Sequence, residues 1–299
     1  MTWPSSGGHH VRERLRVGIA FQGDKRPGEY AELARLVDGY GFDVVSVYND
    51  LLYQPALGPL LWMAPHLARA TLGPAALNPY TAHPIEIAGQ VALLDLATDG
   101  RAYLGLARGA WLDALGIEQA RPLATLREAM LLVCHLLAGR REPFVGDVFG
   151  LVADATLRYA PVRAHVPLTL GTWGLRTARL AGAHADEVKV GGSTNPALVG
   201  HLRPALDAGA ADVGRAPGKV GVCLGAVTVV DEDRAAARAR ARSEVALYLP
   251  VVARLDPTID DPEWLARIES AAARGDYAGS RCISRPASRP SPSPARCSS

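Results

Sequence analysis

The sequence lacks the features that mark secreted, membrane-spanning and zinc-binding proteins. Its 299 residues include four cysteines and no Cys-x-x-Cys pair, so we predict neither a disulfide framework nor a metal site. No apolar run approaches the roughly 18–20 residues that span a bilayer, and the first residues contain no apolar signal core. The net charge of +2 favours neither nucleic acid nor membrane partners. We therefore expect a protein of a reducing cytoplasm.

Several common catalytic and binding motifs are absent as well. The chain has no Gly-x-Ser-x-Gly elbow, Walker loop or His-Glu-x-x-His pair. One helical run is rich in arginine, but such runs usually form solvated helix faces, and we interpret this one in that way. Its basic residues are Arg234, Arg238, Arg240 and Arg242. Any function must therefore be inferred from how strands, helices and loops alternate.

Apolar strands and amphipathic helices alternate along the chain, a pattern typical of a parallel α/β protein. The length suits one barrel domain, because such barrels commonly need roughly 250 residues. We predict a flexible leader (1–14), a barrel domain (15–278) and a disordered tail rich in proline and serine (279–299). The strands are expected at 17–21, 44–47, 71–77, 102–107, 168–170, 187–190 and 220–230. The helices are expected at 28–40, 59–69, 85–96, 123–137, 175–181 and 196–210, and segment 140–165 should form an excursion without a helix.

Polar residues follow two of the predicted strands. In a parallel barrel, the residues just after each strand face the active site. Asn78, Tyr80, Thr81 and His83 follow strand 71–77, and Arg108 follows strand 102–107, so we expect all five at the barrel mouth. His83 precedes a proline, and the alternative is that it caps a loop.

Two glycine-rich turns follow the strands at 168–170 and 187–190. Backbone N–H groups in such turns and at helix N-termini bind phosphate without needing a basic side chain. The alternative is that these glycines only allow the chain to turn. The residues that we assign to a phosphate site are Gly171, Thr172, Trp173, Gly174, Arg176, Gly191, Gly192 and Ser193.

Three charged residues allow two interpretations each. Asp50 follows strand 44–47 and is expected either as an acceptor at the barrel mouth or as a helix N-cap. Glu187 and Lys189 alternate within a strand that should be apolar on both faces. They either project into the barrel or pair with neighbours on its outside.

Five stretches together resemble a known family. They are GFDVVSVYND, GPAALNPYTAHP, TDGRAYLGLARG, LGIEQARPLATLREAM and LTLGTWGLRTARLAGAHADEVKVGG, in this order. The chain is similar to the luciferase-like superfamily of flavin- and coenzyme F420-dependent oxidoreductases, and most similar to its methylenetetrahydromethanopterin reductase branch. The resemblance implies a TIM-like (β/α)8 barrel of the bacterial luciferase type. It also implies hydride transfer between coenzyme F420 and a small organic substrate, in a homodimer.

The resemblance assigns roles to particular residues. It implies a non-proline cis peptide bond between Ala75 and Ala76, against which the cofactor ring packs, with Asn78 beside it. The glycine turns would hold the cofactor phosphate. Asp50, Tyr80, His83 and Arg108 would orient or protonate the substrate, and these four are the expected catalytic residues.

The chain also departs from the family pattern. Ala20 stands where the reductases carry a glutamate, and Leu51 stands where relatives have histidine. The sequence offers no eighth strand, so either another segment closes the barrel or the chain is a shortened relative. Two other hypotheses therefore remain: a monooxygenase that uses FMN, and a degenerate, non-catalytic barrel.

Overall fold

The computed structural model describes residues 15–246 and 248–274, so the predicted leader and tail lie outside this part of the chain. Seven parallel strands form one continuous sheet in the order β1-β2-β3-β4-β7-β8-β9, with isolated bridges joining β3 to β4. This order, in which each strand lies beside the next, is that of a barrel. All seven predicted strands are present, but β3 and β9 end earlier than predicted. They are β1 (Gly18–Phe21), β2 (Val44–Val47), β3 (Thr71–Pro74), β4 (Leu104–Ala107), β7 (Leu168–Gly171), β8 (Glu187–Gly191) and β9 (Gly221–Gly225).

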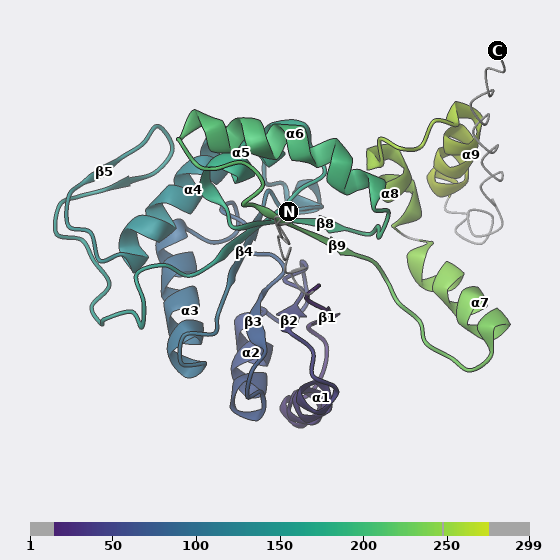
Figure 1. The fold of residues 1–299 in the computed structure, drawn as a ribbon, viewed down its shortest axis with the longest axis horizontal. Helices are drawn as coiled ribbons and strands as arrows, with labels where there is room; N and C mark the ends of the chain where they lie inside the picture. Colours follow the sequence, from purple (N-terminus) through teal and green to yellow (C-terminus); the bar gives the residue numbers. More distant parts are fainter. Residues whose placement is uncertain (1–14, 247, 275–299) are drawn as a thin grey trace, which may run out of the picture.

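Six helices connect these strands and cover the outside of the sheet (Figure 1). Prolines occupy the first turns of α1, α3 and α4, where a missing N–H costs no hydrogen bond. The six helices are α1 (Pro27–Tyr40), α2 (Leu57–Met63), α3 (Pro84–Ala97), α4 (Pro122–Leu137), α5 (Leu175–His184) and α6 (Ala197–Asp212). They match the predicted helices to within a few residues, except at α2.

The predicted helix 59–69 is wrong in its bounds. Helix α2 ends at Met63, and a 3-10 turn, η1 (Ala64–His66), follows. Pro65 lies inside that turn and has no N–H, so it cannot donate the bond that would continue an α-helix.

The core lies between the sheet and its helices. Strand residues that point outward are fully buried and aliphatic, such as Val45, Leu72, Leu106 and Leu170. They pack in one cluster with helix residues that include Ile87. The residues between them in the strands point into the barrel and are mostly small or polar. Our expectation that the strands would be apolar on both faces is therefore wrong.

Segment 140–165 contains no helix, which confirms the predicted excursion. A hairpin of β5 (Phe144–Val145) and β6 (Gly150–Leu151) forms its tip, beside α3 and α4 in Figure 1. The buried carboxylate of Glu128, on α4, accepts hydrogen bonds from the N–H groups of Asp147, Val148 and Phe149 at 2.7–3.0 Å. These bonds fix the hairpin turn to the helix layer.

The C-terminal part differs from the predicted strand 220–230, because β9 already ends at Gly225. Its partner β8 ends at Gly191, and Ser193 then forms only an antiparallel bridge to Gly225, so residues 226–230 have no ladder to join. Three helices follow: α7 (Arg234–Val245), α8 (Leu249–Leu255) and α9 (Pro262–Ala273). Within residues 15–246 and 248–274 the parallel sheet has no eighth strand, and no strand pair joins β9 to β1.

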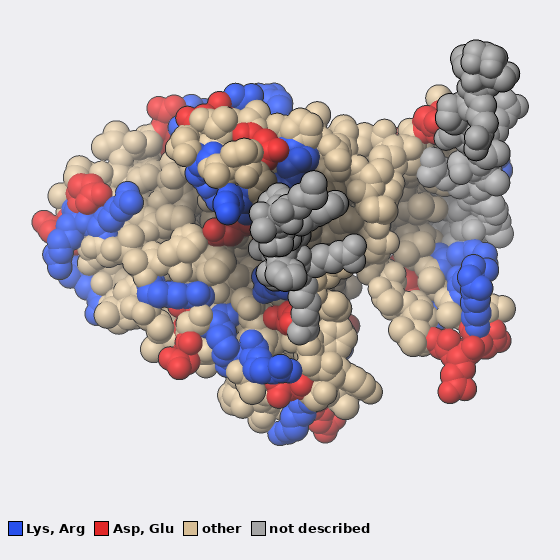
Figure 2. All heavy atoms as spheres, viewed as in Figure 1, with Lys and Arg blue, Asp and Glu red and all other residues tan. Residues whose placement is uncertain are grey.

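Helix α7 carries the arginine run and has no buried residue. Its N-cap Asp233 accepts hydrogen bonds from the N–H groups of Ala235 and Ala236. Figure 2 shows basic side chains on this helix close to acidic ones, as expected for a solvated face. None of the described helices is long and apolar enough to cross a membrane.

Candidate active site

The peptide bond between Ala75 and Ala76 is cis, as predicted. The bond follows β3, in a bulge that is held on both sides. The Ala75 N–H donates to the Val47 carbonyl at 2.8 Å, and the Leu77 N–H donates to the Gly105 carbonyl at 2.9 Å. Both alanines are half-buried, so the bulge offers a shelf of small side chains.

Asn78 organises the loop that follows this shelf. Its side chain is 5% exposed, and its amide oxygen accepts hydrogen bonds from the N–H groups of Tyr80 and Thr81 at 3.1 and 3.0 Å. The Tyr80 hydroxyl donates to the Ala120 carbonyl at 2.8 Å, which ties this loop to the one before α4. The roles of Asn78 at the cofactor and of Tyr80 at the substrate remain predictions.

His83 is the N-cap of α3. Its Nδ1 accepts a hydrogen bond from the Ile85 N–H at 3.2 Å. Its ring packs edge-on against the ring of Phe149, with 5.2 Å between the ring centroids. The neutral imidazole therefore carries its proton on Nε2. The structure shows the capping alternative, and a catalytic role for this exposed histidine remains a prediction.

Asp50 lies half-buried after β2, where its carboxylate accepts a hydrogen bond from Gln22 Nε2 at 3.1 Å. The N-cap alternative is wrong, because α2 begins seven residues further along and its N-cap is Ala56. Asn49 supplies the side-chain acceptor there, for the Ala56 N–H at 3.0 Å. Asp50 is thus available as an acceptor at the mouth.

Arg108 follows β4 with an exposed side chain. Its carbonyl and that of Gly109 both accept from Gln119 Nε2, at 2.9 and 3.0 Å. These bonds fix the backbone and leave the guanidinium in solvent, so its contact with a substrate remains a prediction.

The two glycine turns lie side by side. The Trp173 indole N–H, in the turn after β7, donates to the carbonyl of Gly191 at the end of β8 at 3.0 Å. Thr172 accepts a hydrogen bond from the Gly174 N–H at 3.0 Å, and Gly174 is the N-cap of α5, where no side chain caps the helix. The first turn of α5 also carries the exposed side chain of Arg176.

Gly192 and Ser193 complete the second turn. Gly192 has a φ of 90°, which favours glycine, and its N–H donates to the Gly225 carbonyl at 2.6 Å. The Ser193 hydroxyl accepts from the Asn195 N–H at 3.2 Å. The sequence correctly predicted where these turns lie; their binding of phosphate remains a prediction.

The barrel interior holds polar residues that were not among the predicted site residues. Ser46 and Tyr103 share a hydrogen bond of 2.7 Å, and Thr169 donates to Glu187 at 3.3 Å. A Cβ on Gly73 would overlap the ring of Tyr103, so only glycine leaves room for that ring. We name as the interior polar cluster Ser46, Tyr48, Tyr103, Thr169, Glu187, Lys189 and Cys223.

Burial changes the acidity of this cluster. It raises the pKa of the Tyr103 hydroxyl, and it raises the pKa of the Glu187 carboxyl against the opposing charges of Arg16 and Lys189. Burial and the nearby charge of Asp50 raise the pKa of Tyr48. Each of these groups therefore favours its protonated form more than it would in water.

The alternation of Glu187 and Lys189 was the available sequence signal, and the alternative that places them inside the barrel is confirmed. Lys189 Nζ lies over the ring of Tyr48, 5.9 Å from its centroid. Ser46 and Thr169, on the other strands, gave no such signal, because serine and threonine also occur in ordinary buried strands.

The C-terminal helices reach the mouth. Tyr248, the N-cap of α8, lies with its ring 6.1 Å from that of Trp111, and burial and Asp50 raise its pKa. Asn195 Nδ2 donates to the Thr258 hydroxyl at 2.7 Å. The segment from α8 onward therefore packs on the loops that follow β4 and β8.

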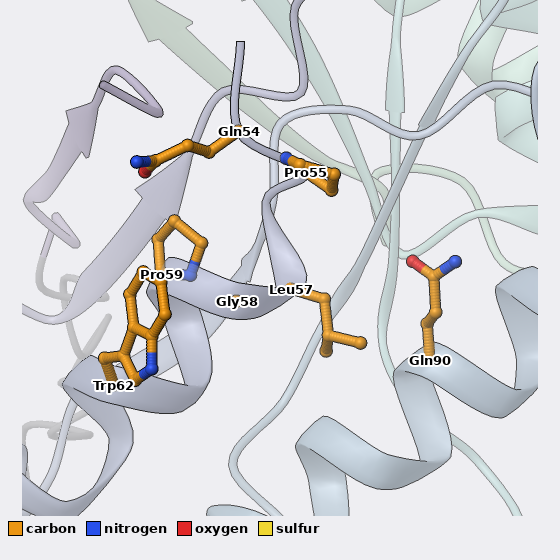
Figure 3. Close-up of a pocket in the computed structure, with 7 residues that line it drawn as sticks. All are labelled: Gln54, Pro55, Leu57, Gly58, Pro59, Trp62 and Gln90. Carbon is orange, nitrogen blue, oxygen red and sulfur yellow. The ribbon is translucent and has the colours of Figure 1, made fainter. Parts of the chain in front are cut away.

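A separate groove lies outside the barrel, between α2 and α3 (Figure 3). Its volume is about 440 Å³, and none of the predicted site residues lines it. The lining residues are Gln54, Pro55, Leu57, Gly58, Pro59, Trp62 and Gln90. This groove is therefore not the predicted cofactor site.

Parallel strands that end in glycine turns at one mouth define a barrel protein of the class that binds ligands at the carboxyl ends of its strands. The model of the luciferase-like monooxygenase family matches residues 6–287. The chain belongs to that family.

Particular relatives support the reductase resemblance. A 5,10-methylenetetrahydromethanopterin reductase from Methanolobus tindarius is 29% identical over 269 residues, which cover 88% of this chain and 81% of the relative. An F420-dependent glucose-6-phosphate dehydrogenase from Nakamurella multipartita is 30% identical over 269 residues, covering 83% and 78%. The solved coenzyme F420-dependent tetrahydromethanopterin reductase from Methanopyrus kandleri superposes with a TM-score of 0.80 at 23% identity, covering 91% of this chain and 83% of that one. This superposition confirms the barrel fold.

Proposed function

We propose that this protein is a coenzyme F420-dependent oxidoreductase, similar to methylenetetrahydromethanopterin reductases, that transfers a hydride between the deazaflavin and a small organic substrate. The observation that carries the proposal is the pair of joined glycine turns at the mouth, in a chain similar to a dehydrogenase and a solved reductase that are both named as F420-dependent. The N–H groups of Thr172, Gly174 and Gly192 already donate within the protein, so the donors left for a ligand are those of the first turn of α5, which begins without a side-chain cap. Such donors suit a phosphate.

The residues present fit a flat cofactor with a phosphate arm. Ala75 and Ala76 would lie against its ring, and the first turn of α5, beside the turn after β8, would hold its phosphate. When bound, the deazaflavin supplies two-electron hydride chemistry. The protein's contribution is orientation, exclusion of water and control of protons.

Several mouth residues could manage those protons. Tyr48 is a phenol at neutral pH, and its raised pKa makes it a weaker acid than a tyrosine in water, so it suits the donation of a hydrogen bond better than the transfer of a proton. Asp50 is placed to accept one, and His83 carries a proton on Nε2. Ala20, in register with Ser46 on the next strand, offers no carboxylate. We therefore propose a substrate that does not depend on a β1 glutamate.

We further propose a homodimer in the cytoplasm. Homodimers are implied by the family resemblance, and Cys134 and Cys223 are free thiols, as a reducing compartment would leave them. Light scattering of the purified protein tests the first proposal, and fractionation of the source cells tests the second.

The experiment that tests the function is a fluorescence titration of the purified protein with coenzyme F420 and, in parallel, with FMN. Micromolar binding of F420 and weaker binding of FMN is the expected result. Preference for FMN would favour the monooxygenase alternative, which the name of the matched family also suggests. Binding of neither would leave a non-catalytic barrel as the better account.

A further inference from the structure

Lys189 is a cation placed inside the barrel. It lies on β8, in register with Gly171 of β7 and Cys223 of β9, at the level where β7 ends. Its ammonium group lies over the ring of Tyr48, the residue that directly follows β2. Lys189 is half-buried, whereas lysine is usually found on the surface.

The glycines around Lys189 leave space beside it. Gly171 and Gly225 occupy neighbouring inward positions and carry no side chain, and a Cβ on Gly225 would lie 3.9 Å from Lys189 Cε. The Thr172 N–H donates to the Lys189 carbonyl at 3.1 Å, so the strand passes directly beneath the first glycine turn. The ammonium group therefore faces the interior below the turns.

No carboxylate in the described part of the chain lies within 4.0 Å of the Lys189 ammonium nitrogen. Glu187 acts on it from a greater distance and receives its hydrogen bond from Thr169. Asp50 receives its hydrogen bond from Gln22. The face of the Tyr48 ring offsets only part of the cost of burying a cation.

We propose that Lys189, supported by Tyr48, forms an oxyanion-binding subsite that takes a carboxylate or phosphate group. Resting on the proposed function, this inference defines the substrate class as an organic anion. The phosphate of the cofactor is a second source of the same chemistry. A charge-assisted hydrogen bond from the ammonium would neutralise both partners inside the barrel. Tyr48 would hold the lysine side chain in place.

Saturation-transfer NMR tests the subsite with three small probes. Acetate and methylphosphonate are anions, and acetamide is the neutral analogue of acetate. They are added to the full-length protein with and without F420, using the wild type, Lys189→Met and the control Lys219→Met. Lys219 is exposed on the loop before β9, so its replacement changes the net charge equally without touching the mouth. The F420 dissociation constant is measured for each variant.

We expect acetate and methylphosphonate, but not acetamide, to bind the wild type and Lys219→Met, with binding about tenfold weaker in Lys189→Met. An unchanged F420 dissociation constant would identify the substrate as the source of the anion. An F420 dissociation constant that rises about tenfold in Lys189→Met alone would identify the cofactor phosphate instead. Both outcomes support the subsite.

Two results would overturn the proposed subsite. The first is that the wild type binds acetate and acetamide equally. The second is that Lys189→Met changes neither the binding of the anions nor the binding of F420. If the wild type binds the anions through Lys189 but does not bind F420, the proposed function fails and the subsite stands. If Lys189→Met melts well below the wild type, Lys189→Gln repeats the test with a polar, neutral side chain.

Discussion

The indole N–H of Trp173 donates a hydrogen bond to the carbonyl of Gly191 and so joins the turns that follow two neighbouring strands. If a phosphate is held between them, its affinity depends on this bond as well as on the glycines.

Trp173→Phe should therefore weaken F420 binding about fivefold, because one neutral hydrogen bond contributes about 1 kcal/mol. A fluorescence titration measures the dissociation constant. Trp62→Phe is the matched control, since Trp62 lies on α2 and lines the groove outside the barrel. Equal dissociation constants for the two variants would argue against phosphate binding between the turns.

The sequence predicted the positions of the strands and most helices because these depend on local patterns, whereas the barrel was implied by the family resemblance. Strands such as 44–47 alternate outward aliphatic residues with inward ones, and prolines mark where α1, α3 and α4 begin. The predicted ends of elements were wrong where one residue or a missing partner strand decides them. Pro65 ends the α-helical part of its segment, and β9 ends at Gly225 because no neighbouring strand continues beside it.

The site was predicted only in part because contacts between distant residues leave no local signal. The glycine turns could be found, since a strand followed by glycine is a pattern. The capping bond of His83 and the position of Tyr48 under Lys189 depend on how separate strands and loops meet. Tyr248 reaches the mouth from a helix that has no recognisable link to it in the sequence.

Arg163 should contribute more to the stability of the fold than an arginine that makes a similar ion pair on the surface. It donates two hydrogen bonds to the buried carboxylate of Asp95, at 3.1 and 2.8 Å, and so ties the excursion to α3. Arg163→Ala leaves that carboxylate buried without a cation, with only the Ala102 N–H at 3.0 Å still donating to it, which should cost about 3 kcal/mol in the free energy of unfolding. Urea unfolding followed by circular dichroism measures it.

The control for this prediction is Arg179→Ala. Arg179 makes an equally bidentate pair with Asp212, at 2.8 and 2.7 Å, but both side chains are largely exposed. Its replacement should leave the free energy of unfolding nearly unchanged. If both variants lose the same stability, burial is not what distinguishes the two pairs.

The capping and catalytic roles of His83 can be separated. His83→Ala should lower the free energy of unfolding by about 1 kcal/mol, because α3 loses its N-cap. His83→Asn should retain the stability, because asparagine is a good N-cap. In any assay in which the wild type turns over F420, a catalytic His83 predicts a lower rate for both variants. A normal rate for His83→Asn would leave capping as its whole role.

Glu128 should make the stability of the hairpin depend on pH. Burial by itself raises the pKa of this carboxyl, but the hydrogen bonds from Phe149, Val148 and Asp147 outweigh burial and hold the pKa below its ordinary value. The ionised form is thus favoured by folding. Its contribution is fully present above the ordinary pKa of 4.5 and is lost as the pH falls through the lower pKa of the folded state.

Glu128→Gln should therefore cost about 2 kcal/mol at pH 7, because an amide brings one acceptor oxygen and an N–H group to three backbone donors. Urea unfolding at pH 7 and again below pH 4 measures the difference between variant and wild type. That difference should shrink at the lower pH, where the wild-type carboxyl gains a proton and loses its advantage. Glu118→Gln, which replaces an exposed carboxyl on the loop before α4, is the control. A cost for Glu128→Gln that stays constant with pH would mean that shape, rather than charge, holds the hairpin turn.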